Sequence, residues 1–190
     1  MFAPLPEVGC KRFSRREWLR NAALLPGLAG VAGGGSLAGE GASDRGGKSP
    51  ALRVQTLEGQ VIEIHKQLGK VVLVDFMTTT CPSCKLASEG IQKLYKELGS
   101  KGFLPLAIAI DPQAANVLPI YRNLYGLAFP VGVLPREDVL RYLNQPSDKP
   151  MLVPTLVLLD KRGRMFNKWV GWPGEQELRS AIAVLLNEKT

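Results

Sequence analysis

The stretch that decides the fold is VVLVDFMTTTCPSC, residues 71–84. Its opening run, Val71–Phe76, is short, apolar and β-branched, which predicts a strand buried on both faces. A helix is predicted over Pro82–Leu98, because apolar residues recur there at helical spacing and Gly99 can end it. The face that these residues form carries Ala87, Ile91, Leu94, Tyr95 and Leu98. Cys81 and Cys84 therefore lie where a buried strand passes into an amphipathic helix.

This position favours redox chemistry for the CxxC motif. A helix N-terminus supplies partial positive charge and unpaired N–H groups, which favour a thiolate at Cys81. Pro82 is tolerated in the first turn, where N–H groups have no helical partner. Cys84 is one turn further along and can reach back to Cys81. The spacing therefore predicts that the two cysteines can close a disulfide.

Two structural roles compete with this interpretation. A zinc site needs two further Cys or His ligands, and beyond residue 38 the chain offers only His65. An inert disulfide that closes so small a ring would stabilise the fold little. We therefore expect redox chemistry at Cys81 and Cys84, with no bound metal and no cofactor.

The rest of the chain alternates strand and helix patterns. The predicted strands are 52–57, 60–64, 71–76, 104–110, 155–159 and 164–170, and the predicted helices are 82–98, 113–126, 136–143 and 174–188. The first two strands form a hairpin, as do the last two around the turn at 160–163. In helix 113–126 we expect Val117, Ile120, Tyr121 and Leu124 to face inward. Strands that alternate with helices predict an α/β fold around a central sheet, which the last hairpin makes mixed.

Residues 1–38 have the three-part layout of an export signal. The sequence Ser-Arg-Arg-Glu-Trp-Leu-Arg at 14–20 resembles a twin-arginine signal, and a Gly/Ala-rich run over 21–37 ends at a possible cleavage site, 36–38. Pro26 and the glycines of this run argue against a stable membrane span. We expect a flexible linker at 39–50 and one domain at 51–190. The location is then periplasmic or otherwise extracytoplasmic, where disulfides persist.

Composition and charge fit a globular domain. The 190 residues are 45% hydrophobic and 22% charged, so a packed core is expected. Residues 1–38 hold 5 of the 24 Lys and Arg and 2 of the 17 Asp and Glu, so 19 cations and 15 anions follow. Because these cations are scattered along the chain, we expect no nucleic acid partner.

The domain resembles the thioredoxin fold and, within it, the exported TlpA/ResA-type thiol–disulfide oxidoreductases. Three parts of the sequence carry the resemblance: residues 72–85 around the CxxC motif, Val153-Pro154-Thr155 with the strand and turn that follow, and the leading hairpin with Gly69-Lys70. The resemblance spans most of 51–190. It implies a central mixed sheet flanked by helices on both faces, with an N-terminal β-hairpin extension.

The resemblance also implies roles for individual residues. Cys81 would be the nucleophile and Cys84 the resolving thiol. Asp75 would be a buried general base for Cys84. Pro154 would be a cis-proline that turns the backbone of Val153 toward a substrate strand. Between the cysteines, Pro82 and Ser83 would contact the substrate.

The sequence departs from the family at three places. Met77 and Thr80 stand where the family usually has Trp, and Pro82-Ser83 stands where Pro-Pro is common. These positions affect substrate preference and reduction potential. Residues 111–150 are longer than a minimal thioredoxin requires, which fits either a partner groove or a plain scaffold.

Three functions remain open from the sequence. The first is a thiol–disulfide oxidoreductase that reduces partner proteins and receives electrons from an upstream membrane redox protein. The second is a peroxidase, because Thr78-Thr79-Thr80-Cys81 resembles the Thr-x-x-Cys of peroxiredoxins, although the expected upstream proline is replaced by Val74. The third is a Cu(I)-binding chaperone that uses the two thiolates. The sequence favours the first.

Overall fold

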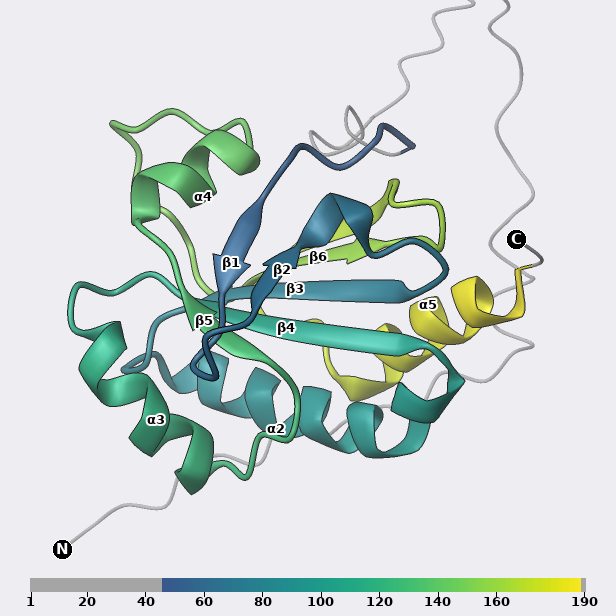
Figure 1. The fold of residues 1–190 in the computed structure, drawn as a ribbon, viewed down its shortest axis with the longest axis horizontal. Coiled ribbons are helices and arrows are strands. Elements are labelled where there is room, and N and C mark those ends of the chain that lie inside the picture. The colour runs from purple at the N-terminus through teal and green to yellow at the C-terminus, as the bar shows by residue number, and fades with distance from the viewer. Residues whose placement is uncertain (1–45, 189–190) are drawn as a thin grey trace, which may run out of the picture. The chain divides into compact units, whose positions relative to one another are not determined.

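The computed structural model describes residues 46–188. The predicted export signal and the first part of the predicted linker lie outside the described residues. The elements below carry the labels of Figure 1.

Five strands form the central sheet in the order β5-β4-β3-β6-β7. They are β3 (Val71–Met77), β4 (Phe103–Ala109), β5 (Val131–Val133), β6 (Thr155–Leu159) and β7 (Met165–Val170). Strand β3 pairs parallel with β4 and antiparallel with β6, so the sheet is mixed. A separate antiparallel pair, β1 (Arg53–Gln55) and β2 (Val61–Glu63), forms the N-terminal hairpin. The predicted mixed sheet and leading hairpin are confirmed.

Helices cover both faces of the sheet. One face packs against α2 (Pro82–Leu98), α3 (Ala114–Leu124) and α5 (Glu175–Asn187). The other packs against α4 (Arg136–Tyr142) and the segment that holds the hairpin and a 3₁₀ turn, η1 (Ile64–Lys66). A second 3₁₀ turn, η2 (Gly99–Lys101), follows α2. Figure 1 shows α2 and α5 on one side of the sheet and α4 on the other, which confirms the expected layers.

Strand β3 lies at the centre of the sheet, and all seven of its residues are buried. Side chains alternate along a strand. Leu73 and Met77 belong to the core beneath α2, whereas Val74 and Phe76 belong to the core on the opposite face. The same alternation directs Asp75 to the α2 face, where Cys84 is also buried.

In the segment 113–133 one strand was not predicted, and one prediction about a helix face was wrong. Strand β5 was not predicted, because three residues of Val-Gly-Val give no periodic signal; it adds to the edge of the sheet beside β4. In α3, Ile120 and Leu124 are 68% and 72% exposed instead of inward. The helix rests on Leu118 and Tyr121, which lie on a neighbouring face.

The end of the predicted linker is packed against the domain. The backbone N–H of Gly46 donates to the carbonyl of Met165 at 2.8 Å, and that of Ser49 donates to the carbonyl of Gly163 at 2.9 Å. Ser49 is buried, and its hydroxyl shares a 2.8 Å hydrogen bond with Tyr142. The end of the predicted linker therefore contacts the domain, and the boundary at 51 stays a prediction.

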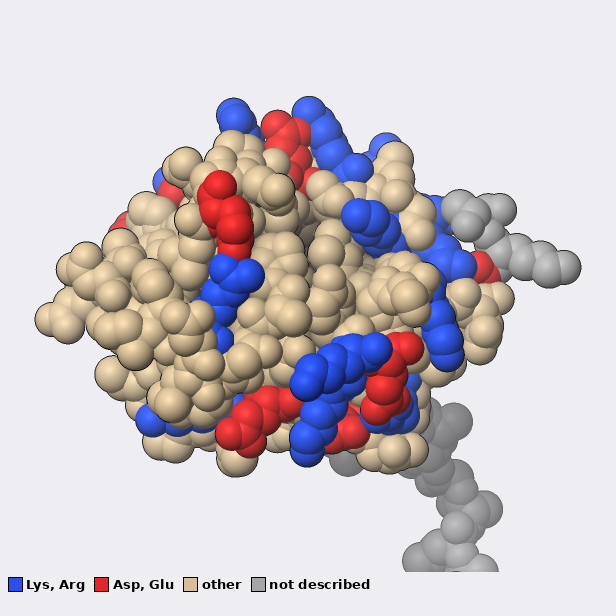
Figure 2. Space-filling model, turned by 60° about the horizontal axis from the view of Figure 1, so that its bottom comes forward, with Lys and Arg blue, Asp and Glu red and all other residues tan. Residues whose placement is uncertain are grey.

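Charges of both signs are interspersed on the face that carries α2, α3 and α5. Figure 2 shows Lys and Arg side chains beside Asp and Glu side chains there, with an uncharged area between them. Arg179 of α5 forms ion pairs with Glu97 of α2 and with Glu175 of its own helix. The first of these ion pairs joins two helices. Among the helices of residues 46–188, none has the length and apolar character needed to cross a membrane.

Candidate active site

Cys81 is the N-cap residue of α2. Its backbone is extended, and its sulfur accepts a hydrogen bond from the N–H of Cys84 at 3.2 Å. The side chain is partly exposed, and its thiol donates to the carbonyl oxygen of Val153 at 3.7 Å. The first turn of a helix carries partial positive charge. Cys81 is thus both accessible to a partner and placed where negative charge on sulfur is stabilised.

Cys84 lies one turn further along and is fully buried. Both cysteines are free thiols in the structure. Burial is the main cause that raises the pKa of Cys84 above its ordinary value, and a hydrogen bond with Cys81 and the charge of Asp75 raise it further. Cys84 is therefore a protonated thiol at neutral pH. It needs a base before it can act as a nucleophile.

Asp75 is the buried acid that the sequence predicted. It is 1% exposed, and its neighbours across the sheet are Ala107 and Leu156. Neither carboxyl oxygen has a hydrogen-bond partner among the described residues. Burial alone raises the pKa of Asp75 from 3.8 to about 7. A carboxyl of this kind can accept or release a proton near neutral pH.

The loop before β6 lies against Cys81. The peptide bond between Val153 and Pro154 is cis, as the resemblance implied. The hydroxyl of Thr155 donates to the carbonyl of Leu152 at 2.6 Å, and the N–H of Gly171 donates to the carbonyl of Pro154 at 2.7 Å. Pro154 is buried, and Val153 is partly exposed. The structure thus brings this loop and the nucleophile together, with Pro82 and Ser83 exposed beside them.

A hollow of about 190 Å³ opens next to this loop. Its wall combines the segment after α4 with the ends of β6 and β7, and it is formed by Gln145, Pro146, Lys149, Pro150, Leu152, Thr155 and Val170. Leu152 and Val170 are 63% and 55% exposed. Part of the long segment 111–150 therefore lies beside the cis-proline.

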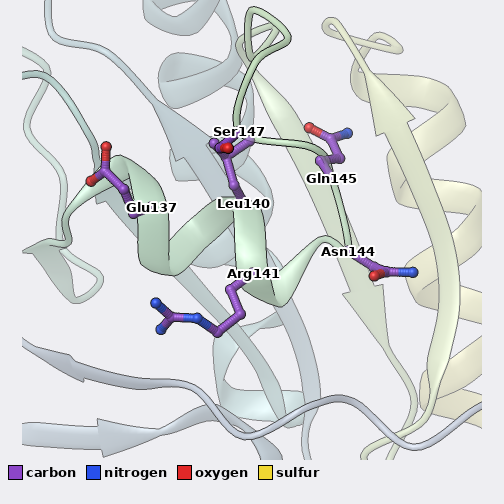
Figure 3. Close-up of a pocket in the computed structure, with 6 residues that line it drawn as sticks. All are labelled: Glu137, Leu140, Arg141, Asn144, Gln145 and Ser147. Carbon is purple, nitrogen blue, oxygen red and sulfur yellow. The ribbon is translucent and has the colours of Figure 1, made fainter.

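A larger hollow of about 390 Å³ lies over α4 and the loop that follows it. Figure 3 shows its mostly polar lining, in which Glu137 and Arg141 come from the helix and Asn144 and Gln145 from the loop. None of its lining residues belongs to the cysteine motif or to the cis-proline loop. This hollow is separate in sequence from the predicted site.

The sequence analysis missed two polar contacts near the cysteines. The backbone N–H and the hydroxyl of Thr79 each donate a 2.9 Å hydrogen bond to the carboxylate of Asp111. Ser88 and Tyr121 share a buried hydrogen bond of 3.0 Å between α2 and α3. The sequence did offer a signal for the contact with Thr79, because Asp111 follows shortly after the predicted strand 104–110. At the two positions where the family usually has Trp, Met77 is buried and Thr80 is exposed.

Within residues 46–188, no group of three or more His, Cys, Asp or Glu side chains lies close enough to hold a metal ion. His65, the remaining candidate ligand, lies in η1.

Comparison with known proteins agrees with this geometry. A family model described as thioredoxin-like matches residues 69–165. The thiol-disulfide oxidoreductase ResA of Bacillus thuringiensis is 28% identical over 137 residues, which cover 72% of this chain and 76% of that protein. ResA of Halalkalibacterium halodurans is 26% identical over 135 residues, covering 71% and 73%.

Solved structures show the same fold. A putative thiol:disulfide interchange protein DsbE from Chlorobium tepidum superposes with a TM-score of 0.67 at 22% identity, covering 76% of this chain and 99% of that one. StoA from Bacillus subtilis superposes with a TM-score of 0.58 at 20% identity, covering 70% and 96%. The chain therefore belongs to the thioredoxin-like family, as a thiol–disulfide oxidoreductase of the ResA/TlpA type.

Proposed function

We propose that this protein reduces disulfides of partner proteins in an extracytoplasmic compartment, with Cys81 and Cys84 as its redox pair. The observation that carries the proposal is the arrangement of the two sulfurs. Cys81 is partly exposed and caps α2, and the N–H of the buried Cys84 donates to its sulfur. An exposed attacking thiol backed by a protected second thiol is what a two-step exchange needs.

In the first step the thiolate of Cys81 attacks one sulfur of the partner disulfide. A mixed disulfide forms, and the partner's other sulfur leaves as a thiolate that takes a proton. In the second step the carboxylate of Asp75 accepts the proton of Cys84. The thiolate of Cys84 then attacks the sulfur of Cys81, closes the Cys81–Cys84 disulfide and releases the second partner sulfur. Two electrons pass to the partner, which ends as a dithiol.

The substrate is an extended polypeptide segment around the partner disulfide. The backbone of Val153 lies next to the nucleophile, so a partner strand that pairs with it brings its own sulfur to Cys81. Pro154 holds this backbone in place, and the exposed Pro82 and Ser83 contact the partner on the helix side.

The sequence supports the location, and the family resemblance suggests the electron source. The predicted twin-arginine signal at 1–38 would export the folded protein, and an upstream membrane redox protein would return Cys81 and Cys84 to the dithiol state. Replacing both Arg15 and Arg16 with lysine tests the export route. Fractionation should then find the protein retained inside the cell, and an unchanged distribution would contradict this route.

The first test of the function is the reduction potential of the Cys81–Cys84 pair in dithiothreitol and glutathione buffers. A value near that of thioredoxin, about −270 mV, supports a reductase. A value near −120 mV supports an oxidant that donates disulfides. The absence of a reversible two-electron couple would exclude the redox function. Hydrogen peroxide consumption and metal analysis of the same protein then test the peroxidase and Cu(I)-binding alternatives.

A further inference from the structure

The loop before Cys81 is held by a carboxylate from the neighbouring strand. Strands β3 and β4 run parallel, and their register places Met77 beside Ala109. Thr79 and Asp111 each lie two residues beyond these partners, so the two strands deliver them to the same edge of the sheet. There the Asp111 carboxylate accepts both donors of Thr79, one at each oxygen.

These two hydrogen bonds are strengthened by burial and by the charge of the carboxylate that accepts them. Thr79 is 6% exposed, so its N–H and hydroxyl have little access to water. A carboxylate that accepts two bonds forms charge-assisted contacts, which are about twice as strong as neutral ones. Without this acceptor the buried donors would be unsatisfied, at a cost typical of desolvated polar groups. The loop therefore has one strongly preferred position.

The position of this loop determines where Cys81 lies, because the two are close together in the chain. Only Thr80 separates Thr79 from Cys81, and the N–H of Cys81 donates to the carbonyl of Thr78 at 3.3 Å. The sulfur of Cys81 must lie at the N-cap for the N–H of Cys84 to reach it at 3.2 Å. A displaced loop would move the sulfur away from this donor and from Val153.

We propose that Asp111 is a positioning residue for the redox reaction, because its two hydrogen bonds with Thr79 hold Cys81 at the start of α2. This inference rests on the proposed function and adds a residue that acts through Thr79 and touches no reacting atom. In the dithiol state only non-covalent contacts hold Cys81 in place, whereas in the disulfide state the bond to Cys84 does so. The Asp111–Thr79 contact therefore keeps the sulfur of Cys81 at the N-cap of α2 in the dithiol state and speeds its attack on a partner disulfide.

The test compares the full chain with Asp111→Ala, Thr79→Val and the double variant. The probe is oxidised glutathione, and the rate of its reaction with the reduced protein is measured. We expect Asp111→Ala to slow attack about tenfold. Because the two residues act as a pair, the double variant should resemble Asp111→Ala instead of adding to it. Thr79→Ser keeps the hydroxyl and should restore most of the rate.

Control measurements separate positioning from stability. Asp138→Ala removes an exposed carboxylate that pairs with Arg141 in α4 and should not change the rate. A variant that loses stability but keeps the wild-type rate would overturn the proposal, and Thr79→Val decides the matter if Asp111→Ala does not fold. A wild-type protein without a reversible couple would instead refute the proposed function itself.

Discussion

Replacing Asp75 with asparagine should remove a loss of stability that the fold suffers as the pH rises from 5 toward neutral. The wild-type carboxyl has a pKa of about 7 when folded, against 3.8 as its ordinary value, because it is buried without a partner among the described residues. Between these two values the folded state holds a proton that the unfolded chain has lost. The free energy of unfolding therefore falls as the pH rises through this range, by about 1.4 kcal/mol per pH unit, and levels off above pH 7.

An asparagine at this position does not titrate and escapes this loss. Relative to the wild type, the free energy of unfolding of Asp75→Asn should rise by about 2.5 kcal/mol between pH 5 and pH 8. Urea titrations of both proteins at the two pH values, with the cysteines kept reduced, measure this difference. The comparison between pH values removes any effect of the substitution that does not depend on protonation.

Asp138→Asn is the matched control, since Asp138 is exposed on α4. Its stability relative to the wild type should be the same at both pH values. If the difference between Asp75→Asn and the wild type changed by less than about 0.5 kcal/mol, the folded carboxyl would titrate near its ordinary pKa. The assignment of Asp75 as a general base near neutral pH would then lose its basis.

Four further substitutions test the site and the packing around it. Cys84→Ser should leave the partner attached to Cys81 as a mixed disulfide, detectable on non-reducing gels, whereas Cys81→Ser should capture none. Gly90→Ala brings a Cβ to 2.5 Å from the Trp172 side chain and should lower the free energy of unfolding by about 1–3 kcal/mol in urea titrations. Gly132→Ala should lower the free energy of unfolding by more in the same titration, because its Cβ would lie 2.6 Å from the Gln55 carbonyl oxygen and backbone atoms move less easily than a side chain. A loss equal to or smaller than that of Gly90→Ala would contradict this packing.

The elements that carry the site were predictable because their signals are local. The apolar run at 71–76 predicts a central strand, and the helical spacing after Cys81 predicts α2 from end to end. The same reasoning failed at β5, which has three residues and depends on its pairing with β4. It also failed for Ile120 and Leu124, since helical spacing alone does not decide which of two neighbouring apolar faces packs inward.

The contact between Thr79 and Asp111 required knowledge that the sequence alone did not supply. The two residues are 32 positions apart, and they meet because two parallel strands end at the same edge in a particular register. A shift of one residue in that register would direct one of the two side chains to the other face. Local patterns indicate strands well, but register depends on packing over the whole sheet.

Burial sets both the chemistry and the cost of this site. It raises the pKa of Cys84, which under the proposed mechanism keeps the resolving thiol protonated until a mixed disulfide forms. It also raises the pKa of Asp75 to about 7, which suits the proton transfer proposed for this carboxyl. The same desolvation makes an ionised Asp75 unfavourable, which is why the fold should lose stability as the pH rises toward 7. A hydrogen-bond donor beside Asp75 would recover that stability but would lower its pKa and weaken it as a base. Among residues 46–188 the Asp75 carboxyl has no hydrogen-bond partner, so the proposed proton transfer comes at the expense of stability above pH 5.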